Sequence, residues 1–385
     1  MKKDIFIYYI FNFLLGFYIA NGTTVLFART LGFSYQQVFI LGAIYMLMFI
    51  FFEVPSGAFA DLLGRKKSVA LGCVIVALGA LATGASQTFW QVFASLVPWA
   101  LGFSFISGAD QALLYDRISD SKIYIQILGR SKFFFLSATA LAGILGPFLF
   151  GINFRYPYLF SAIPFFGGGL AILFFQEARE KHVFTLRKHW EQIKEGVRFT
   201  KNNQYILWSM GLLALTFAVW YNLFNSYQPF LMDVGFTLRA FSFILPAIFL
   251  CEALGGMIAA KLLEFLGENK IFILGLLLFG AAVGAAGVFN NKLSLIFLLL
   301  YCVLLGILRT SLSGYANRHI ESSHRATVVS VQSMAATLAA ALSLFLFGFL
   351  TDRLGISQLF IVLGIVTLVC SFVLLLFRPR ESGMT

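Results

Sequence analysis

The chain has 385 residues, of which 59% are hydrophobic and only 12% are charged. Soluble domains average about 25% charged residues, so this composition excludes a soluble globular protein and indicates an integral membrane protein. The net charge of +11 does not indicate nucleic acid binding, because most Lys and Arg residues fall in alternate loops between apolar segments, as the positive-inside rule describes. We therefore expect the lipid bilayer, and no nucleic acid, as the surroundings of the chain.

In chain order, long apolar segments predict twelve transmembrane helices. Their number and the distribution of Lys and Arg predict a multi-pass protein of the cell (inner) membrane, with both termini in the cytoplasm. The predicted helices lie near residues 5–28, 36–60, 68–88, 91–115, 131–152, 156–176, 205–230, 236–262, 271–289, 293–317, 326–350 and 357–377.

One long polar stretch, 177–204, interrupts this pattern. It divides the chain into a six-helix bundle at 1–176 and a second one at 205–385. Apolar residues at helical spacing within the stretch predict an amphipathic helix on the cytoplasmic membrane surface, for which a solvated tether between the halves has at least as much support as a regulatory role. The predicted fold is therefore an all-α membrane protein with two pseudo-symmetric six-helix bundles.

The two halves share a membrane-buried pattern. The segment 53–60, EVPSGAFA, recurs as 252–259, EALGGMIA, and Asp110 has Arg309 at the matching position. Ionisable side chains inside apolar segments are energetically costly and are functional candidates by default. A duplicated bundle with such residues is typical of transporters. The candidates for proton coupling or for lining a cavity are Glu53, Asp110, Glu252 and Arg309.

Several roles remain open for these four residues. Glu53 either carries a coupling proton or is a protonated structural acid. Asp110 either binds a cation, carries a proton or pairs with a cationic side chain. Arg309 cannot easily be neutralised, so it requires an acidic partner, Asp110 or Glu252, or an anionic substrate. Common ancestry of the halves could also account for Glu252.

Residues 57–67 read GAFADLLGRKK and fall between the second and third predicted helices. This segment resembles the G-x-x-x-D-x-x-G-R-K/R-K/R motif of the major facilitator superfamily. The resemblance extends over the whole chain and implies alternating access between two bundles. It also implies a conformational lock formed by Asp61, Gly64 and Arg65, for which Asp116 is the candidate partner. The alternative is that Asp116 is a helix-end charge facing water.

Polar and aromatic residues in three predicted helices are candidates for binding a substrate. The seventh helix is the richest, and its outer half is equally compatible with an interfacial aromatic belt around a helix break. The candidates are Asn12, Asn21, Gln111, Trp220, Tyr221, Asn222, Asn225 and Tyr227.

The fifth helix contains Gly146-Pro147-x-x-x-Gly151, which resembles part of the antiporter element of drug:proton exporters, although Phe150 replaces one glycine. Pro98 occupies a position where such exporters carry arginine. We therefore expect proton-coupled efflux of amphipathic compounds by a monomer. The energy source is the proton gradient, and neither a cofactor nor a metal is expected. The alternatives are an importer or facilitator of a small anionic or zwitterionic solute, a lipid flippase, and a non-transporting sensor. The sequence shows no pairing of a nucleophile with a base, so we do not expect an enzyme.

Overall fold

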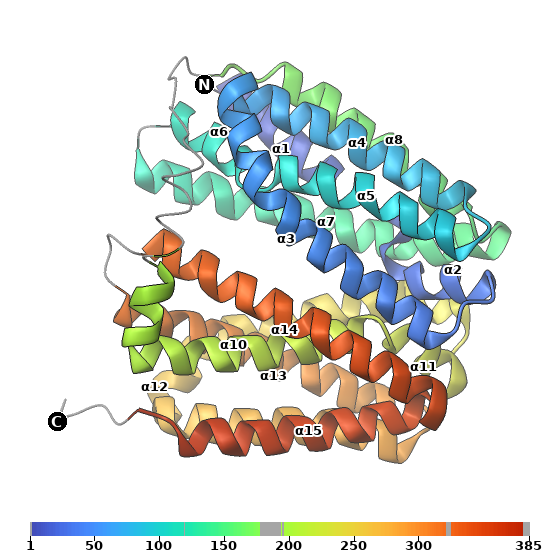
Figure 1. Ribbon diagram of the computed structural model, residues 1–385, viewed down its shortest axis with the longest axis vertical. Coiled ribbons are helices and arrows are strands. Elements are labelled where there is room, and N and C mark those ends of the chain that lie inside the picture. Colours follow the sequence, from blue (N-terminus) through green and yellow to red (C-terminus); the bar gives the residue numbers. More distant parts are fainter. Residues whose placement is uncertain (1, 119, 178–193, 195, 321–324, 380–385) are drawn as a thin grey trace. The chain divides into compact units, whose positions relative to one another are not determined.

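The computed structural model describes residues 2–118, 120–177, 194, 196–320 and 325–379, and its secondary structure in these ranges is helical throughout (Figure 1). In the first half the helices are α1 (Lys2–Gly16), η1 (Ile19–Gly22), α2 (Thr24–Thr30), α3 (Tyr35–Leu63), α4 (Arg65–Ala85), α5 (Phe89–Ile106), α6 (Ala109–Arg117), α7 (Ser121–Ile152) and α8 (Tyr156–Leu173). In the second half they are α10 (Gln204–Phe224), α11 (Tyr227–Asp233), η2 (Leu238–Ala240), α12 (Phe241–Phe289), α13 (Ser294–His319), α14 (Arg325–Leu354) and α15 (Ile356–Leu376).

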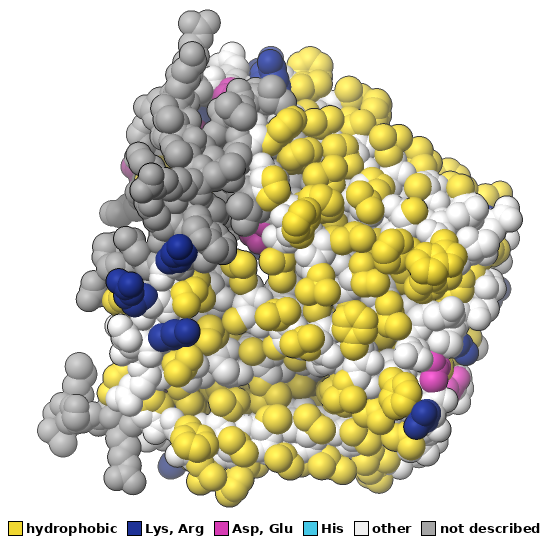
Figure 2. Space-filling model, in the orientation of Figure 1, with side chains coloured by type: hydrophobic (Ala, Val, Ile, Leu, Met, Phe, Trp, Pro, Cys, Tyr) yellow, Lys and Arg dark blue, Asp and Glu magenta, His cyan; other side chains and the backbone are white. Residues whose placement is uncertain are grey.

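Among the described residues, 11 helical segments are long and apolar enough to cross a membrane. One of them, Leu238–Phe289, contains two of the predicted spans, which meet at Gly267 with φ of 75°. The all-helical membrane fold predicted from the sequence is therefore confirmed. Hydrophobic side chains also dominate the visible surface of the helices (Figure 2), and Phe265, Phe243 and Met257 are 76–85% exposed. An apolar surface of this extent suits a lipid environment.

The chain forms two compact units. Unit 1 comprises Met1–Phe33, Ile44–Lys188 and Leu238–Pro246, and unit 2 comprises Ser34–Ala43, His189–Thr237 and Ala247–Thr385. Most of the amphipathic helix predicted within 177–204 lies outside the described residues, and the predicted domain boundaries stay a prediction.

Three of the predicted spans are interrupted. The first is divided at Phe17–Tyr18, the fourth at Ser107–Gly108 and the seventh at Asn225–Ser226. At the fourth, Gly108 has φ of 74°, a value that glycine adopts without strain. Each interruption leaves helix ends, and therefore backbone groups that need partners outside the regular helix pattern, within a membrane-spanning segment.

Glycine residues permit close helix crossings in both units. In unit 1, a Cβ added at Gly102 would lie 2.7 Å from the carbonyl oxygen of Gly72, so α4 and α5 are in backbone contact. In unit 2, a Cβ at Gly306 would lie 2.0 Å from the carbonyl oxygen of Glu252. Small residues allow such contact between membrane helices. At this crossing Glu252 of α12 contacts Gly306 of α13. Gly306 lies one turn before Arg309 on the same helix, so the crossing brings Glu252 near Arg309.

Candidate functional site

The structure pairs Arg309 with Glu252. The guanidinium Nη1 of Arg309 lies 2.5 Å from Oε1 of Glu252, and the two side chains are 30% and 22% exposed. The Arg309 guanidinium also lies over the indole of Trp220 from α10, with Cζ 4.9 Å from the ring centroid. Of the two acids suggested for Arg309 by the sequence, Glu252 is the one in contact. The carboxylate balances the charge of Arg309, and Trp220 covers the guanidinium face.

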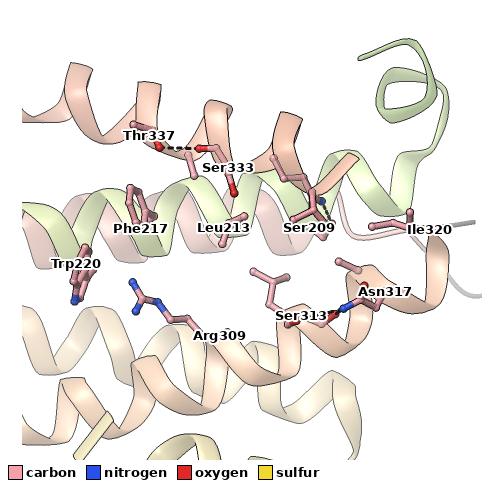
Figure 3. Close-up of a pocket in the computed structure, with 15 residues that line it drawn as sticks. Ser209, Leu213, Phe217, Trp220, Arg309, Ser313, Asn317, Ile320, Ser333 and Thr337 are labelled. Atoms are coloured by element: carbon pink, nitrogen blue, oxygen red, sulfur yellow. Dashed lines mark hydrogen bonds between the residues drawn. The ribbon is translucent and has the colours of Figure 1, made fainter. Parts of the chain in front are cut away.

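Arg309 and Trp220 stand at one end of a cavity of about 480 Å³ within unit 2. Its lining comes mainly from α10, α13 and α14, and Figure 3 shows Trp220, Phe217, Leu213 and Ser209 following one another along α10. Hydroxyl and amide side chains from α13 and α14 face the same space. The complete lining is Ser209, Leu213, Phe217, Trp220, Arg309, Leu312, Ser313, Ala316, Asn317, Ile320, Val329, Gln332, Ser333, Ala336 and Thr337.

Hydrogen bonds hold several of these polar side chains in place. Nε2 of Gln332 donates to the Ser209 hydroxyl at 3.0 Å, which ties α14 to α10. Nδ2 of Asn317 donates to the Ser313 carbonyl at 2.9 Å, and the Thr337 hydroxyl donates to the Ser333 carbonyl at 2.9 Å. The cavity thus has fixed neutral polar groups along its length and a charged, internally balanced pair at its end.

Among the five substrate candidates on the seventh span, Trp220 lines this cavity. Asn222 is fully buried and donates instead to the Ser343 hydroxyl at 2.7 Å. Asn225 donates to the Tyr221 carbonyl at 2.7 Å, and Tyr227 is 4% exposed. These four side chains pack within unit 2 around the interrupted helix rather than along the cavity.

The sequence interpretation missed six neutral polar residues of the cavity. A signal for them exists: on α13, Ser313 and Asn317 follow Arg309 at intervals of four, and on α14 Ser333 and Thr337 have the same interval. Polar residues recurring at i, i+4 in an otherwise apolar helix share one face. The missed residues are Ser209, Ser313, Asn317, Gln332, Ser333 and Thr337.

Asp110 lies in unit 1, in the first turn of α6 just after the interruption at Gly108. Its half-buried carboxylate accepts a backbone hydrogen bond from Gln111 and interacts with the hydroxyl of Tyr8 on α1. Tyr124 on α7 lies within electrostatic range of it. No arginine, lysine or histidine of the described chain forms an ion pair with Asp110.

The candidate lock residues lie near one end of unit 1. Gly64 has φ of 94° and turns the chain between α3 and α4, as the motif predicts. Arg65 forms an ion pair with Asp116 and donates to the Ala112 carbonyl at 3.0 Å. The side chain of Asp61 lies outside the described ones.

Glu177, which the sequence interpretation did not single out, completes this turn. Its carboxylate accepts the backbone N–H of Lys66 at 3.1 Å, in the first turn of α4. A carboxylate is favoured there, because the first N–H groups of a helix lack intrahelical partners. The acid that begins the polar stretch therefore holds the loop between α3 and α4.

Unit 2 has a counterpart of this pair with the charges exchanged. Glu268 follows Gly267, which has a positive φ like Gly64, and pairs with Arg318 near the end of α13. In unit 1 the turn supplies the arginine and the fourth span supplies the acid. In unit 2 the turn supplies the acid and the tenth span supplies the arginine.

The remaining candidates lie apart from the cavity lining. Glu53 and Gln111 are exposed. Asn12 is buried and donates from Nδ2 to the Tyr8 carbonyl at 2.9 Å, and Asn21 lies half-buried in η1. Asn12 therefore lies next to Tyr8, whose hydroxyl interacts with Asp110.

Comparisons with known proteins agree with this architecture. The model of the Major Facilitator Superfamily matches residues 5–247 and 210–384. The uncharacterized MFS-type transporter YxaM of Bacillus subtilis (strain 168) is 24% identical and covers 94% of this chain and 93% of its own length. Among solved structures, a D-xylose-proton symporter has a TM-score of 0.78 at 12% identity, with 98% of both chains covered. A bacterial homolog of the human lysosomal transporter Spinster has a TM-score of 0.75 at 16% identity and covers 97% of this chain and 95% of its own. The resemblance seen in residues 57–67 is thereby confirmed, and this chain is a member of the Major Facilitator Superfamily, a family of membrane transporters.

Proposed function

We propose that this transporter moves amphipathic organic compounds out of the cell in exchange for protons. The observation that carries the proposal is the cavity of unit 2, in which Trp220 and Phe217 lie beside neutral hydroxyl and amide groups. Binding cavities of this kind combine apolar walls with a few fixed polar groups that orient the ligand. Such a lining suits a solute with one apolar and one hydrogen-bonding face.

The balanced charge of Arg309 supports an amphipathic solute over a simple anion. Glu252 occupies the guanidinium at 2.5 Å, so an anionic ligand must displace a carboxylate that is already in place. A neutral or cationic solute meets no such competition. The cavity can therefore accept solutes without a negative charge at no electrostatic cost to the pair.

Protons are proposed as the coupling ions because acids lie in membrane-spanning helices. Glu252 is one candidate proton carrier, because its carboxylate balances the charge of Arg309 at the cavity wall. Asp110 and Glu53 are the other candidate proton carriers, and the gradient itself supplies the energy without a bound cofactor. The partial antiporter element at residues 146–151 supports the outward direction.

The ion pair between Arg65 and Asp116 is proposed as part of a conformational lock. It joins the first turn of α4 to the last turn of α6, two segments far apart in sequence. Asp116→Asn should leave Arg65 without its charged partner and should shift the distribution between transport conformations. Unchanged transport and an unchanged distribution, measured by distances between spin labels, would refute the role of this pair.

Import of a small anionic or zwitterionic solute is the second candidate. Its support is that Arg309 lines the cavity and is aligned by Trp220 at 4.9 Å. A carboxylate ligand would replace Glu252 as the partner of the guanidinium.

Transport in inside-out membrane vesicles separates the two candidates. A fluorescent amphipathic dye should accumulate in the vesicle lumen when the lumen is made acidic, because protons then flow out as the dye enters, and it should leave on addition of a protonophore. Glu252→Gln should abolish this accumulation, whereas Glu264→Gln, an exposed acid on the same helix, should not. If the chain transports no dye but takes up a labelled small carboxylate into whole cells in an Arg309-dependent manner, import is correct and efflux is wrong.

A further inference from the structure

Unit 1 contains a cavity of about 490 Å³, which shares no lining residue with the cavity of unit 2. Its walls come from α1, η1, α7 and α8, and α1 contacts both α7 and α8. The nine residues that line it carry neither a charged nor a polar side chain, and Phe13, Phe17 and Phe160 are among them. A polar solute would lose its hydrogen bonds to water in such surroundings without replacing them, so the lining fits a hydrocarbon.

Three features of the sequence account for this space. Gly167 on α8 has no side chain, and a Cβ placed there would approach Leu14 at 3.6 Å, which is an ordinary contact distance. Pro164, three residues earlier, lacks the backbone N–H that the interior of a helix requires, which makes α8 less regular at this point. The first span is interrupted at Phe17–Tyr18, so α1 ends beside the cavity.

The cavity extends across this interruption. Phe13 and Leu14 belong to α1 before the break, and Ile19 belongs to η1 after it. Helix α7 holds η1 by direct backbone contact, because a Cβ added at Gly146 would lie 2.3 Å from the carbonyl oxygen of Ile19. A ligand in the cavity would therefore touch the chain on both sides of the break, next to a segment that α7 already fixes.

The cavity lies at the depth of lipid acyl chains. Phe13 follows Lys2, the first residue of α1, by 11 residues, which is about 16 Å and close to the middle of a hydrocarbon core of about 30 Å. Phe160 is only about 6 Å from the start of α8 at Tyr156, and the two rings pack at 5.6 Å. Tyrosine is favoured where the hydrocarbon meets the lipid headgroups. The cavity thus runs from near the headgroup level towards the membrane centre, as an acyl chain does.

The side chains at the rim of the cavity are exposed on the apolar surface of unit 1. Ile163 is 65% exposed and Phe160 is 40% exposed, and the neighbouring Phe166 and Leu170 are both 48% exposed. In a membrane such side chains face hydrocarbon, so a chain can enter without crossing a polar layer. An unfilled space would forfeit the dispersion contacts of its walls. These contacts, and not the hydrophobic effect, drive association inside a bilayer.

We propose that this cavity binds one acyl chain of a membrane lipid, which stabilises the interrupted form of the first span. The headgroup lies near Tyr156, and the end of the chain lies near Gly167. Because the bound chain contacts Phe13 before the break and Ile19 after it, occupancy favours the interrupted form over a straight first span. The site requires neither a particular transported solute nor a particular coupling ion.

Photolabelling of the purified full-length protein tests the site. The probe is a phosphatidylglycerol whose palmitoyl chain carries a terminal diazirine, and it is titrated into the protein in detergent. The labelled residues are located by mass spectrometry. Labelling of Phe13 and Phe17 should saturate at about one lipid per protein, as for a single site. Labelling of Leu170, on the exposed surface of α8, should instead keep rising with the amount of probe.

Variants assign the effect to the cavity. Gly167→Leu fills the space with a side chain and should lower labelling of Phe13 roughly tenfold, whereas Leu170→Phe adds bulk to the exposed surface of the same helix and should leave it unchanged. Unlabelled phosphatidylglycerol should raise the unfolding temperature of the unmodified protein by roughly 2 °C or more. It should also slow hydrogen exchange of the backbone amides around Tyr18, and Gly167→Leu should show neither effect. If that variant does not fold, Leu149→Phe fills the cavity from α7 in its place.

Each alternative result contradicts a defined part of the inference. Labelling that never saturates, or that rises in parallel at Phe13 and Leu170, would show ordinary surface lipid and overturn the site. Saturable labelling with unchanged hydrogen exchange around Tyr18 would overturn the effect on the first span. Displacement of the probe by the amphipathic dye of the transport assay would assign the cavity to the solute and overturn the lipid. Loss of the proposed efflux function would change none of these measurements, so the two proposals fail separately.

Discussion

Removing Glu252 should destabilise unit 2 more than removing both members of the pair. In Glu252→Gln, Arg309 keeps its charge inside a membrane-spanning helix without the carboxylate at 2.5 Å. An unpaired arginine at the centre of such a helix costs roughly 2.5–3.5 kcal/mol on insertion scales. Arg309 is 30% exposed, borders a cavity and keeps its contact with Trp220, so we expect about 2 kcal/mol.

The double variant Glu252→Gln/Arg309→Gln contains neither charge and should recover most of this loss. The pair is therefore expected to show a coupling energy of about 1–2 kcal/mol in a double-mutant cycle. Thermal unfolding of the purified protein is the assay, and the double variant should unfold roughly 2–4 °C above Glu252→Gln. If the double variant instead loses the sum of both single effects, Arg309 does not depend on Glu252 and the charge-balance argument fails.

Three further predictions concern packing, the exchanged ion pair and a helix cap. Gly306→Ala should lower the unfolding temperature, because its Cβ would lie 2.0 Å from a backbone oxygen. The control Gly314→Ala meets no atom within 4 Å, so it should match or raise the unfolding temperature. Equal effects of the two variants would contradict the close crossing. Reversing one charge, Arg318→Glu or Glu268→Arg, should destabilise the protein by about 1 kcal/mol, since the pair is partly exposed. The double reversal should restore stability, and thermal unfolding of all three variants checks this. Asp352→Asn should lower the free energy of unfolding by about 1 kcal/mol, because the Asp352 carboxylate accepts the first two N–H groups of α3 at 2.8 and 2.9 Å. Hydrogen exchange of the backbone amides at the start of α3 should become faster. An unchanged exchange rate there would refute the cap.

The membrane architecture could be predicted from the sequence because each span is a long apolar segment. The loop motif could be recognised because Gly64 has φ of 94°, a backbone conformation that few other residues adopt. Gly64 and the contact of Arg65 with Asp116 are where the motif suggested. The interruptions were harder to predict. Ser107–Gly108 lies within a continuous apolar run, and hydropathy does not distinguish a straight span from a broken one.

The cavity could be predicted only in part, because aromatic and amide residues drew attention to the wrong face of the seventh span. Asn222 and Asn225 bond to groups within the packed unit, whereas Ser209 and Gln332 line the cavity. Serine is common in packed membrane helices, so its role depends on which side of the helix faces a space. That information comes from tertiary packing and not from residue type.

Helix α12 has a mechanical consequence. The boundary between the two units falls immediately after Pro246, inside this helix, and a second boundary falls inside α3 between Ala43 and Ile44. Proline cannot donate the backbone hydrogen bond that a helix interior requires, so the helix is weakened within one turn of that boundary. The segment of α12 around Pro246 is therefore expected to bend more easily than the rest of this helix, and substitution of Pro246 by alanine should stiffen it.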